Sequence, residues 1–116
     1  MDVYHIWCNL KPGVSDVEFA ERVAGYLGEL ERAGRIAGFR LTRRKLGLGP
    51  ERLGEFHVAI EVRDLAQLDE AFRAVSTRAG PLEVLHAAVN QSARDLCFAL
   101  YRDFPDPQRE RGGEAF

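Results

Sequence analysis

Two short segments hold the side chains best suited to chemistry. His5, Trp7 and Asn9 alternate along VYHIWCNL, and His57 and Glu61 alternate along EFHVAIEVR. An imidazole exchanges protons near neutral pH because its ordinary pKa is about 6.5. We therefore predict His5 or His57 as the proton-transfer group and Trp7 as an aromatic wall for a bound molecule.

Basic and aromatic residues outside these two segments complete the predicted ligand site. Arg40 and Arg44 lie in FRLTRRKL, and Tyr101 lies near the end of the last predicted strand. A guanidinium group pairs well with an anion, so either arginine could clamp an anionic ligand. The alternative interpretation is that these charges protect an edge strand from aggregation. The sequence thus predicts binding of a small aromatic or anionic molecule.

The same polar residues have a second, purely structural interpretation. His5, Asn9, His57 and Glu61 could satisfy one another in a subunit interface without vacant space. His5, His57 and Glu61 also form a set of two histidines and one carboxylate, which could hold a divalent metal. Their spacing gives no support to a metal site because they come from different strands. We predict a histidine–carboxylate hydrogen bond instead, with neither metal nor cofactor.

Length and charge narrow the class of protein. The chain has 116 residues and a net charge of −2, which predicts one domain and argues against a nucleic-acid binder. Its apolar residues fall into periodic segments, which argues against a membrane protein. No signal peptide is evident at the N-terminus, so we expect a cytoplasmic location. Residues 1–104 are predicted to form the domain, and residues 105–116 a flexible tail.

Hydrophobic periodicity divides the chain into four strands and three helices. Ser15 with Glu18 forms a capping box, Asp64 caps a second helix, and Pro81 opens a short third helix. A glycine-rich connection joins the second and third strands. The predicted strands are residues 3–10, 39–46, 55–63 and 95–103, and the predicted helices are residues 16–33, 65–80 and 82–91.

This element order predicts an α+β fold. Right-handed crossovers favour a ferredoxin-like βαββαβ antiparallel sheet, with strand order 4-1-3-2, helices on one face and an extra short helix before the last strand. The other face would expose Val3 and Trp7, so we predict a homodimer that pairs two such faces. Cys8 and Cys97 are predicted to be free thiols on opposite faces of the sheet.

Three segments also carry a resemblance to a known superfamily. YHIWCNL, the glycine-rich hairpin leading to EFHVAIEVRDLAQLDEAF, and the closing FALYRDFPDP resemble the dimeric α+β barrel superfamily. Within it, the chain is most similar to small uncharacterised bacterial proteins. The resemblance covers about residues 3–107 and implies the fold and a dimer with an internal cavity. It transfers no activity, because the fold hosts unrelated functions.

The resemblance leaves several functions open. In haem-degrading members, asparagine, tryptophan and histidine act together, so His86 could be a haem or proton-transfer ligand or a partly exposed helix residue. We favour a small-molecule-binding protein. The alternatives are a cofactor-independent monooxygenase- or isomerase-like enzyme and a purely structural or stress-related dimer.

Overall fold

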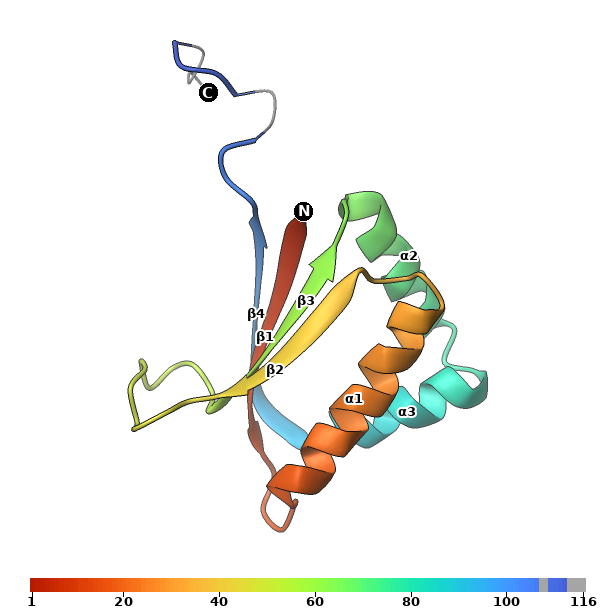
Figure 1. Cartoon of the computed structure of the whole chain (residues 1–116). Coiled ribbons are helices and arrows are strands. Elements are labelled where there is room, and N and C mark those ends of the chain that lie inside the picture. The colour runs from red at the N-terminus through yellow and green to blue at the C-terminus, as the bar shows by residue number, and fades with distance from the viewer. Residues whose placement is uncertain (107–108, 113–116) are drawn as a thin grey trace.

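The computed structural model describes residues 1–106 and 109–112. Within them, strands and helices follow one another in the order β1, α1, β2, β3, α2, α3, β4 (Figure 1). This is the element order that the sequence predicts. The bounds are β1 Asp2–Leu10, α1 Asp16–Arg32, β2 Gly38–Arg43, β3 Phe56–Val62, α2 Leu65–Ser76, α3 Gly80–Asn90 and β4 Ala93–Arg102.

The strands form one antiparallel sheet in the order β2-β3-β1-β4. This order confirms the predicted 4-1-3-2 arrangement, read from the other edge. β1 and β3 are central because each pairs on both sides, while β2 and β4 form the edges. The α+β ferredoxin-like fold is therefore confirmed.

The helices cover one face of the sheet (Figure 1). Alternation along β3 places its apolar residues on this face, where Val58, Ile60 and Val62 are buried. Cys8 of β1 is buried beside them. Helical spacing predicts a buried stripe of Phe19, Val23, Tyr26 or Leu27, and Leu30 on α1, and the structure buries Phe19, Val23, Leu27 and Leu30 against the sheet. Burial of these side chains is the main force that holds the two layers together.

Helical spacing of the apolar residues in the second helix predicts a buried stripe of Leu65, Leu68, Phe72 and Val75, and the structure departs from it in part. Leu65 and Phe72 are exposed, and Gln67 is buried instead. The Gln67 amide is satisfied by backbone, since its Oε1 accepts from the Arg63 N–H at 2.8 Å and its Nε2 donates to the Gly34 carbonyl at 3.1 Å. A buried polar group with such partners carries little penalty, so Gln67 is buried beside Leu68 and Ala71 of the same helix.

Two predicted boundaries are wrong for local reasons. The second helix ends at Ser76 rather than Gly80, because Arg78 takes a positive φ of 50° that breaks the helix. Gly80 becomes the first residue of α3. The second strand ends at Arg43 rather than Leu46, which also has a positive φ.

The connection between β2 and β3 packs closely on β1. A Cβ atom on Gly54 would lie 2.3 Å from the backbone carbonyl carbon and oxygen of Cys8, so only glycine fits without a shift. The Asn9 Oδ1 accepts from the Glu55 N–H at 2.9 Å, and the Arg44 Nη2 donates to the Pro50 and Leu53 carbonyls. These contacts hold the glycine-rich connection against the sheet.

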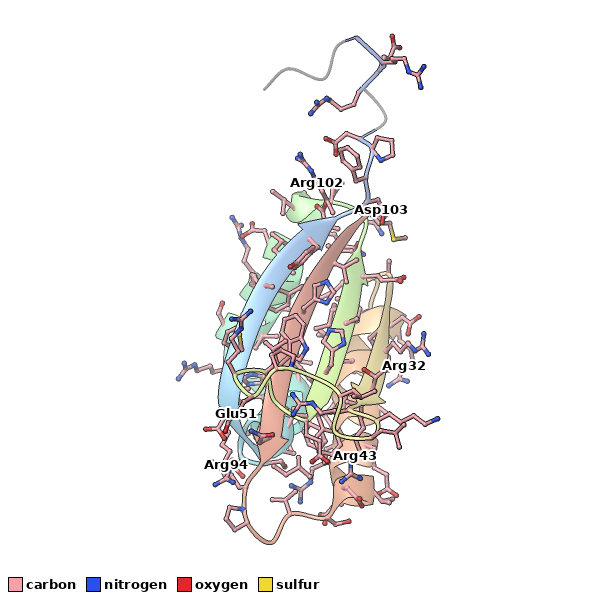
Figure 2. The ribbon with its side chains drawn as sticks, turned by 90° about the vertical axis from the view of Figure 1, so that its left-hand side faces the viewer. Arg32, Arg43, Glu51, Arg94, Arg102 and Asp103 are labelled. Atoms are coloured by element: carbon pink, nitrogen blue, oxygen red, sulfur yellow. The ribbon has the colours of Figure 1, made fainter. Side chains whose placement is uncertain are left out.

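The opposite face of the sheet carries no helix among the described residues (Figure 1). The β2–β3 connection stands out on that side and crosses in front of the strands in Figure 2. Cys8 and Cys97 are both free, on opposite faces, as predicted. No described helix is long and apolar enough to cross a bilayer. Part of the predicted C-terminal tail, residues 107–108 and 113–116, lies outside the described residues, and its flexibility stays a prediction.

Candidate functional site

Strand register arranges the predicted site residues in rows across the uncovered face, which we call the open face. Trp7 of β1 pairs with His57 of β3, which pairs with Thr42 of β2. In the next row, His5 pairs with Ala59 on one side and Ala99 on the other. The two alanines leave room around the imidazole, because neither side chain extends beyond its Cβ atom. The sequence-predicted juxtaposition of His5 and Trp7 with His57 is therefore present.

His5 and His57 are hydrogen-bonded through their rings. The Nδ1 of His5 lies 2.8 Å from the Nε2 of His57. One of these nitrogens must carry the proton and the other the lone pair, so at least one ring is neutral. Burial lowers the pKa of His57, and the nearby charge of His5 lowers it further. The Thr42 hydroxyl lies 3.4 Å from the other His57 nitrogen and 3.4 Å from the His57 carbonyl oxygen, to which it can donate.

Aromatic rings surround this imidazole pair. Trp7 is stacked on His57, with ring centroids 4.7 Å apart and an interplanar angle of 19°. Tyr101 meets His5 edge-on, with centroids 5.0 Å apart. The cluster buries apolar ring surface, while its outer side remains unpartnered within this protomer.

The remaining predicted site residues are placed differently. Arg40 of β2 and Glu61 of β3 lie on the open face, where Glu61 is opposite Gly38. Among the described residues, no hydrogen bond joins Glu61 to the imidazole of His5 or His57. The guanidinium of Arg44 is bound to carbonyls of the connection. Asn9 donates to Asp95 at 3.1 Å and accepts from Glu55. Arg44 and Asn9 therefore hold backbone segments in place, and their roles in ligand binding stay predictions.

A shallow cavity of about 240 Å³ lies between the open face and the β2–β3 connection. Trp7, Thr42 and His57 form its sheet side, and the other lining residues, from the end of β2 and the connection, include the predicted ligand residue Arg44 and also Arg43, Leu48, Gly49, Pro50, Leu53, Gly54 and Glu55. No three His, Cys, Asp or Glu side chains among residues 1–106 and 109–112 gather to hold a metal ion. The set of His5, His57 and Glu61 is thus not assembled as a metal site.

A second and more apolar cavity lies inside the fold, between the helix layer and the sheet. Its volume is about 260 Å³. Its walls come from the core face of β1 and β3 and from all three helices, including Tyr4, Ile6, Val58 and Ala71. We call it the inner cavity. A concave apolar space with few polar groups is the usual form of a small-molecule site.

Polar side chains gather at one end of the inner cavity. Tyr26 of α1 and His86 of α3 face each other with ring centroids 5.4 Å apart. Burial raises the pKa of Tyr26 to about 12, with a further contribution from the negative charge of Glu83. The His86 Nδ1 lies 3.8 Å from the Glu83 Oε2, which accepts no hydrogen bond. This end can therefore offer a neutral phenol donor and an imidazole to a ligand.

Sequence reasoning identified His86 as a candidate but missed its neighbours. Glu83, His86 and Asn90 recur at spacings of three and four residues, which places them on one side of a helix. This signal could have been found in the sequence. No such local signal marks Tyr26, because its contact with α3 is long-range.

The comparisons with known proteins identify a family and a fold. The family model described as "Family of unknown function (DUF6614)" matches residues 1–116. A search of curated proteins finds no match. The structure is similar to that of the Arabidopsis thaliana protein At3g17210, with a TM-score of 0.70 and 14% identity over 91% of this chain and 98% of that chain.

Two further solved structures extend the similarity. A protein from Jannaschia sp. CCS1, described as a dimeric ferredoxin-like protein of unknown function, has a TM-score of 0.64 and 13% identity over 89% of this chain and 100% of that chain. A structure described as an antibiotic biosynthesis monooxygenase has a TM-score of 0.58 and 17% identity over 90% of this chain and 100% of that chain. Similarity at these identities establishes the fold alone.

Proposed function

Because the chain belongs over its whole length to a family of unknown function, we propose its function from its sites: it binds a small molecule in the inner cavity of a homodimer. The observation that carries the proposal is the inner cavity itself, about 260 Å³ of mainly apolar space that ends at Tyr26 and His86. Apolar walls supply affinity, and the few polar groups orient the bound molecule.

Filling the inner cavity tests this proposal. Ala71 of α2 is buried on the cavity wall, so Ala71→Leu places a larger side chain in the space. Ala66 lies exposed on the same helix, and Ala66→Leu is the matched control. Isothermal titration with 4-methylphenol should detect binding to the wild type and to Ala66→Leu, and at least about tenfold weaker binding to Ala71→Leu.

Circular dichroism first establishes that both variants fold, and the affinities of the three proteins are then compared. Equal affinity in all three proteins would place the ligand outside the inner cavity. Absence of binding to the wild type would remove the support for a small phenolic ligand at Tyr26 and His86.

The open face supports the homodimer. Helices occupy the other face, and Tyr101 is 63% exposed beside the aromatic and imidazole rings. Pairing two open faces would bury these rings, and the similar Jannaschia protein is described as dimeric. Tyr101→Asp should convert the dimer to monomer in sedimentation velocity. Val17→Asp, at a site 64% exposed on α1, should leave it intact. A wild-type monomer at micromolar concentration would contradict the proposal.

A catalytic role is a second candidate, favoured by the hydrogen-bonded imidazoles of His5 and His57. Such a pair can accept and return a proton without a cofactor, as an isomerase-like or monooxygenase-like enzyme would require. One structurally similar protein is described as a monooxygenase. If turnover of a phenolic compound is found, His57→Gln should abolish it while sedimentation still gives a dimer. Undiminished turnover would exclude the pair from the chemistry.

A further inference from the structure

The inner cavity opens to solvent at the β4 side of the fold. Much of its wall is made by buried core residues such as Phe19, Val23 and Leu27, whereas three of its apolar wall residues, Phe72, Leu96 and Phe98, are about half-exposed. Tyr4 lies between two of them, stacked on Phe98 with centroids 6.1 Å apart and edge-on to Phe72 at 5.5 Å. The opening therefore has an aromatic rim.

Apolar surface continues outward from this rim. Leu100 follows Phe98 on the same side of β4, because alternate residues of a strand share a face, and it is also about half-exposed. The cavity of about 260 Å³ is smaller than the roughly 300–1,000 Å³ of sites that enclose a drug-sized ligand. A longer ligand would have to leave through the rim and lie on Leu100.

The charges around the inner cavity decide which head group a ligand can place at Tyr26 and His86. No lysine, arginine, aspartate or glutamate is among its described wall residues. The nearest carboxylate, Glu83, already disfavours the negative form of Tyr26. An anionic head group at Tyr26 and His86 would meet the same repulsion without a cation to offset it. A neutral hydroxyl or carbonyl group can hydrogen-bond there without that cost.

We infer that the inner cavity takes a neutral amphipathic ligand, whose hydroxyl or carbonyl head contacts Tyr26 and His86 and whose alkyl tail leaves past the aromatic rim, over Phe98 and along Leu100. This inference rests on the proposed function and deepens it by naming the ligand class. It also differs from the anionic ligand that the arginines of the open face predict from sequence, because none of those arginines lines the inner cavity.

Three probes of related shape test the inference by isothermal titration on the full chain at pH 7.5. The probes are 4-methylphenol, 4-pentylphenol and the 4-pentylbenzoate anion. The pentyl tail adds four methylene groups that the half-exposed groove covers in part, so 4-pentylphenol should bind at least about tenfold tighter than 4-methylphenol. The benzoate should bind at least about tenfold weaker than 4-pentylphenol.

Variants locate the tail. Phe98→Ser removes one wall of the rim at a half-exposed position, so it should weaken 4-pentylphenol binding more than 4-methylphenol binding and bring the two affinities close together. Val84→Ser, at an exposed apolar residue of α3 outside the cavity wall, should preserve the wild-type ratio. If Phe98→Ser does not fold, Leu100→Ser gives the same test further along the groove.

Each result has a defined meaning. Equal wild-type affinity for the two phenols would overturn the alkyl groove while leaving the inner cavity as a binding site. Tighter binding of the benzoate would overturn the neutral head group. Failure of all three probes to bind would count against the proposed function itself.

Discussion

The packing of Gly54 on the backbone of Cys8 makes a quantitative prediction. A Cβ atom at position 54 would lie 2.3 Å from two atoms of the Cys8 carbonyl group, and backbone atoms of a central strand cannot move aside as a flexible side chain can. Gly54→Ala must displace either the connection or β1. Forced overpacking costs about 1–3 kcal/mol, and this contact falls at the upper end, so we expect about 3 kcal/mol of lost stability.

The matched control is the same substitution on α1. A Cβ atom at Gly28 would meet only Nη1 of Arg32 at 3.6 Å, which is an ordinary contact with the end of a flexible side chain. Replacing a glycine inside a helix by alanine stabilises it by about 1 kcal/mol. The two Gly→Ala changes should therefore move stability in opposite directions.

Thermal unfolding followed by circular dichroism measures both effects. At about 4 °C per kcal/mol for a domain of this size, Gly54→Ala should lower Tm by about 12 °C and Gly28→Ala should raise it by about 4 °C. A Gly54→Ala protein with the wild-type Tm would refute the close packing of the connection on β1. A destabilised Gly28→Ala protein would refute the open surroundings of that helix position.

Three further predictions concern the two sides of the sheet. The pKa of His57 is lowered in the folded state, so below about pH 6.5 the unfolded chain takes up the proton first and stability falls as the pH drops through the folded pKa. The loss of Tm between pH 7.5 and 5.5 should be smaller in His57→Gln, and an equal loss would contradict this. Cys8 is 2% exposed and burial raises its pKa to about 11, so a thiol reagent should modify Cys8 only after unfolding, whereas Cys97 on the open face should react in the folded monomer of Tyr101→Asp. Rapid native labelling of both would contradict this placement. Asn9→Ala should cost about 1–3 kcal/mol in denaturant unfolding because it leaves the Glu55 N–H without its acceptor, and an unchanged midpoint would show that water replaces the amide.

Much of the fold could be predicted because its signals are local. Strict alternation in β3 identifies the buried face, and Ser15 and Asp64 accept from the amides of Glu18 and Gln67 at the helix starts, as the capping patterns predict. Short right-handed connections then leave few topologies, which explains why the strand order was correct. The pairing of Trp7 with His57 followed from that order.

The errors arose where contacts distant in sequence decide the structure. Gln67 is polar, and hydropathy alone places it at the surface, whereas the carbonyl of Gly34 on another segment makes its burial favourable. The sequence did not predict that the guanidinium of Arg44 binds two carbonyls of its own connection, and the role of Arg44 in ligand binding stays a prediction. The contribution of Tyr26 to the inner cavity was missed in the same way, since Tyr26 meets His86 from a helix far away in the chain.

The location of a bound phenol tests the central claim most directly. A crystal structure of the protein soaked with 4-bromophenol would give the bromine position from its anomalous signal, independently of any assumption about the site. The proposed function predicts the bromine inside the inner cavity, with the phenol hydroxyl near Tyr26 and His86. Bromine on the open face beside Trp7 and His57, with the inner cavity closed, would contradict it.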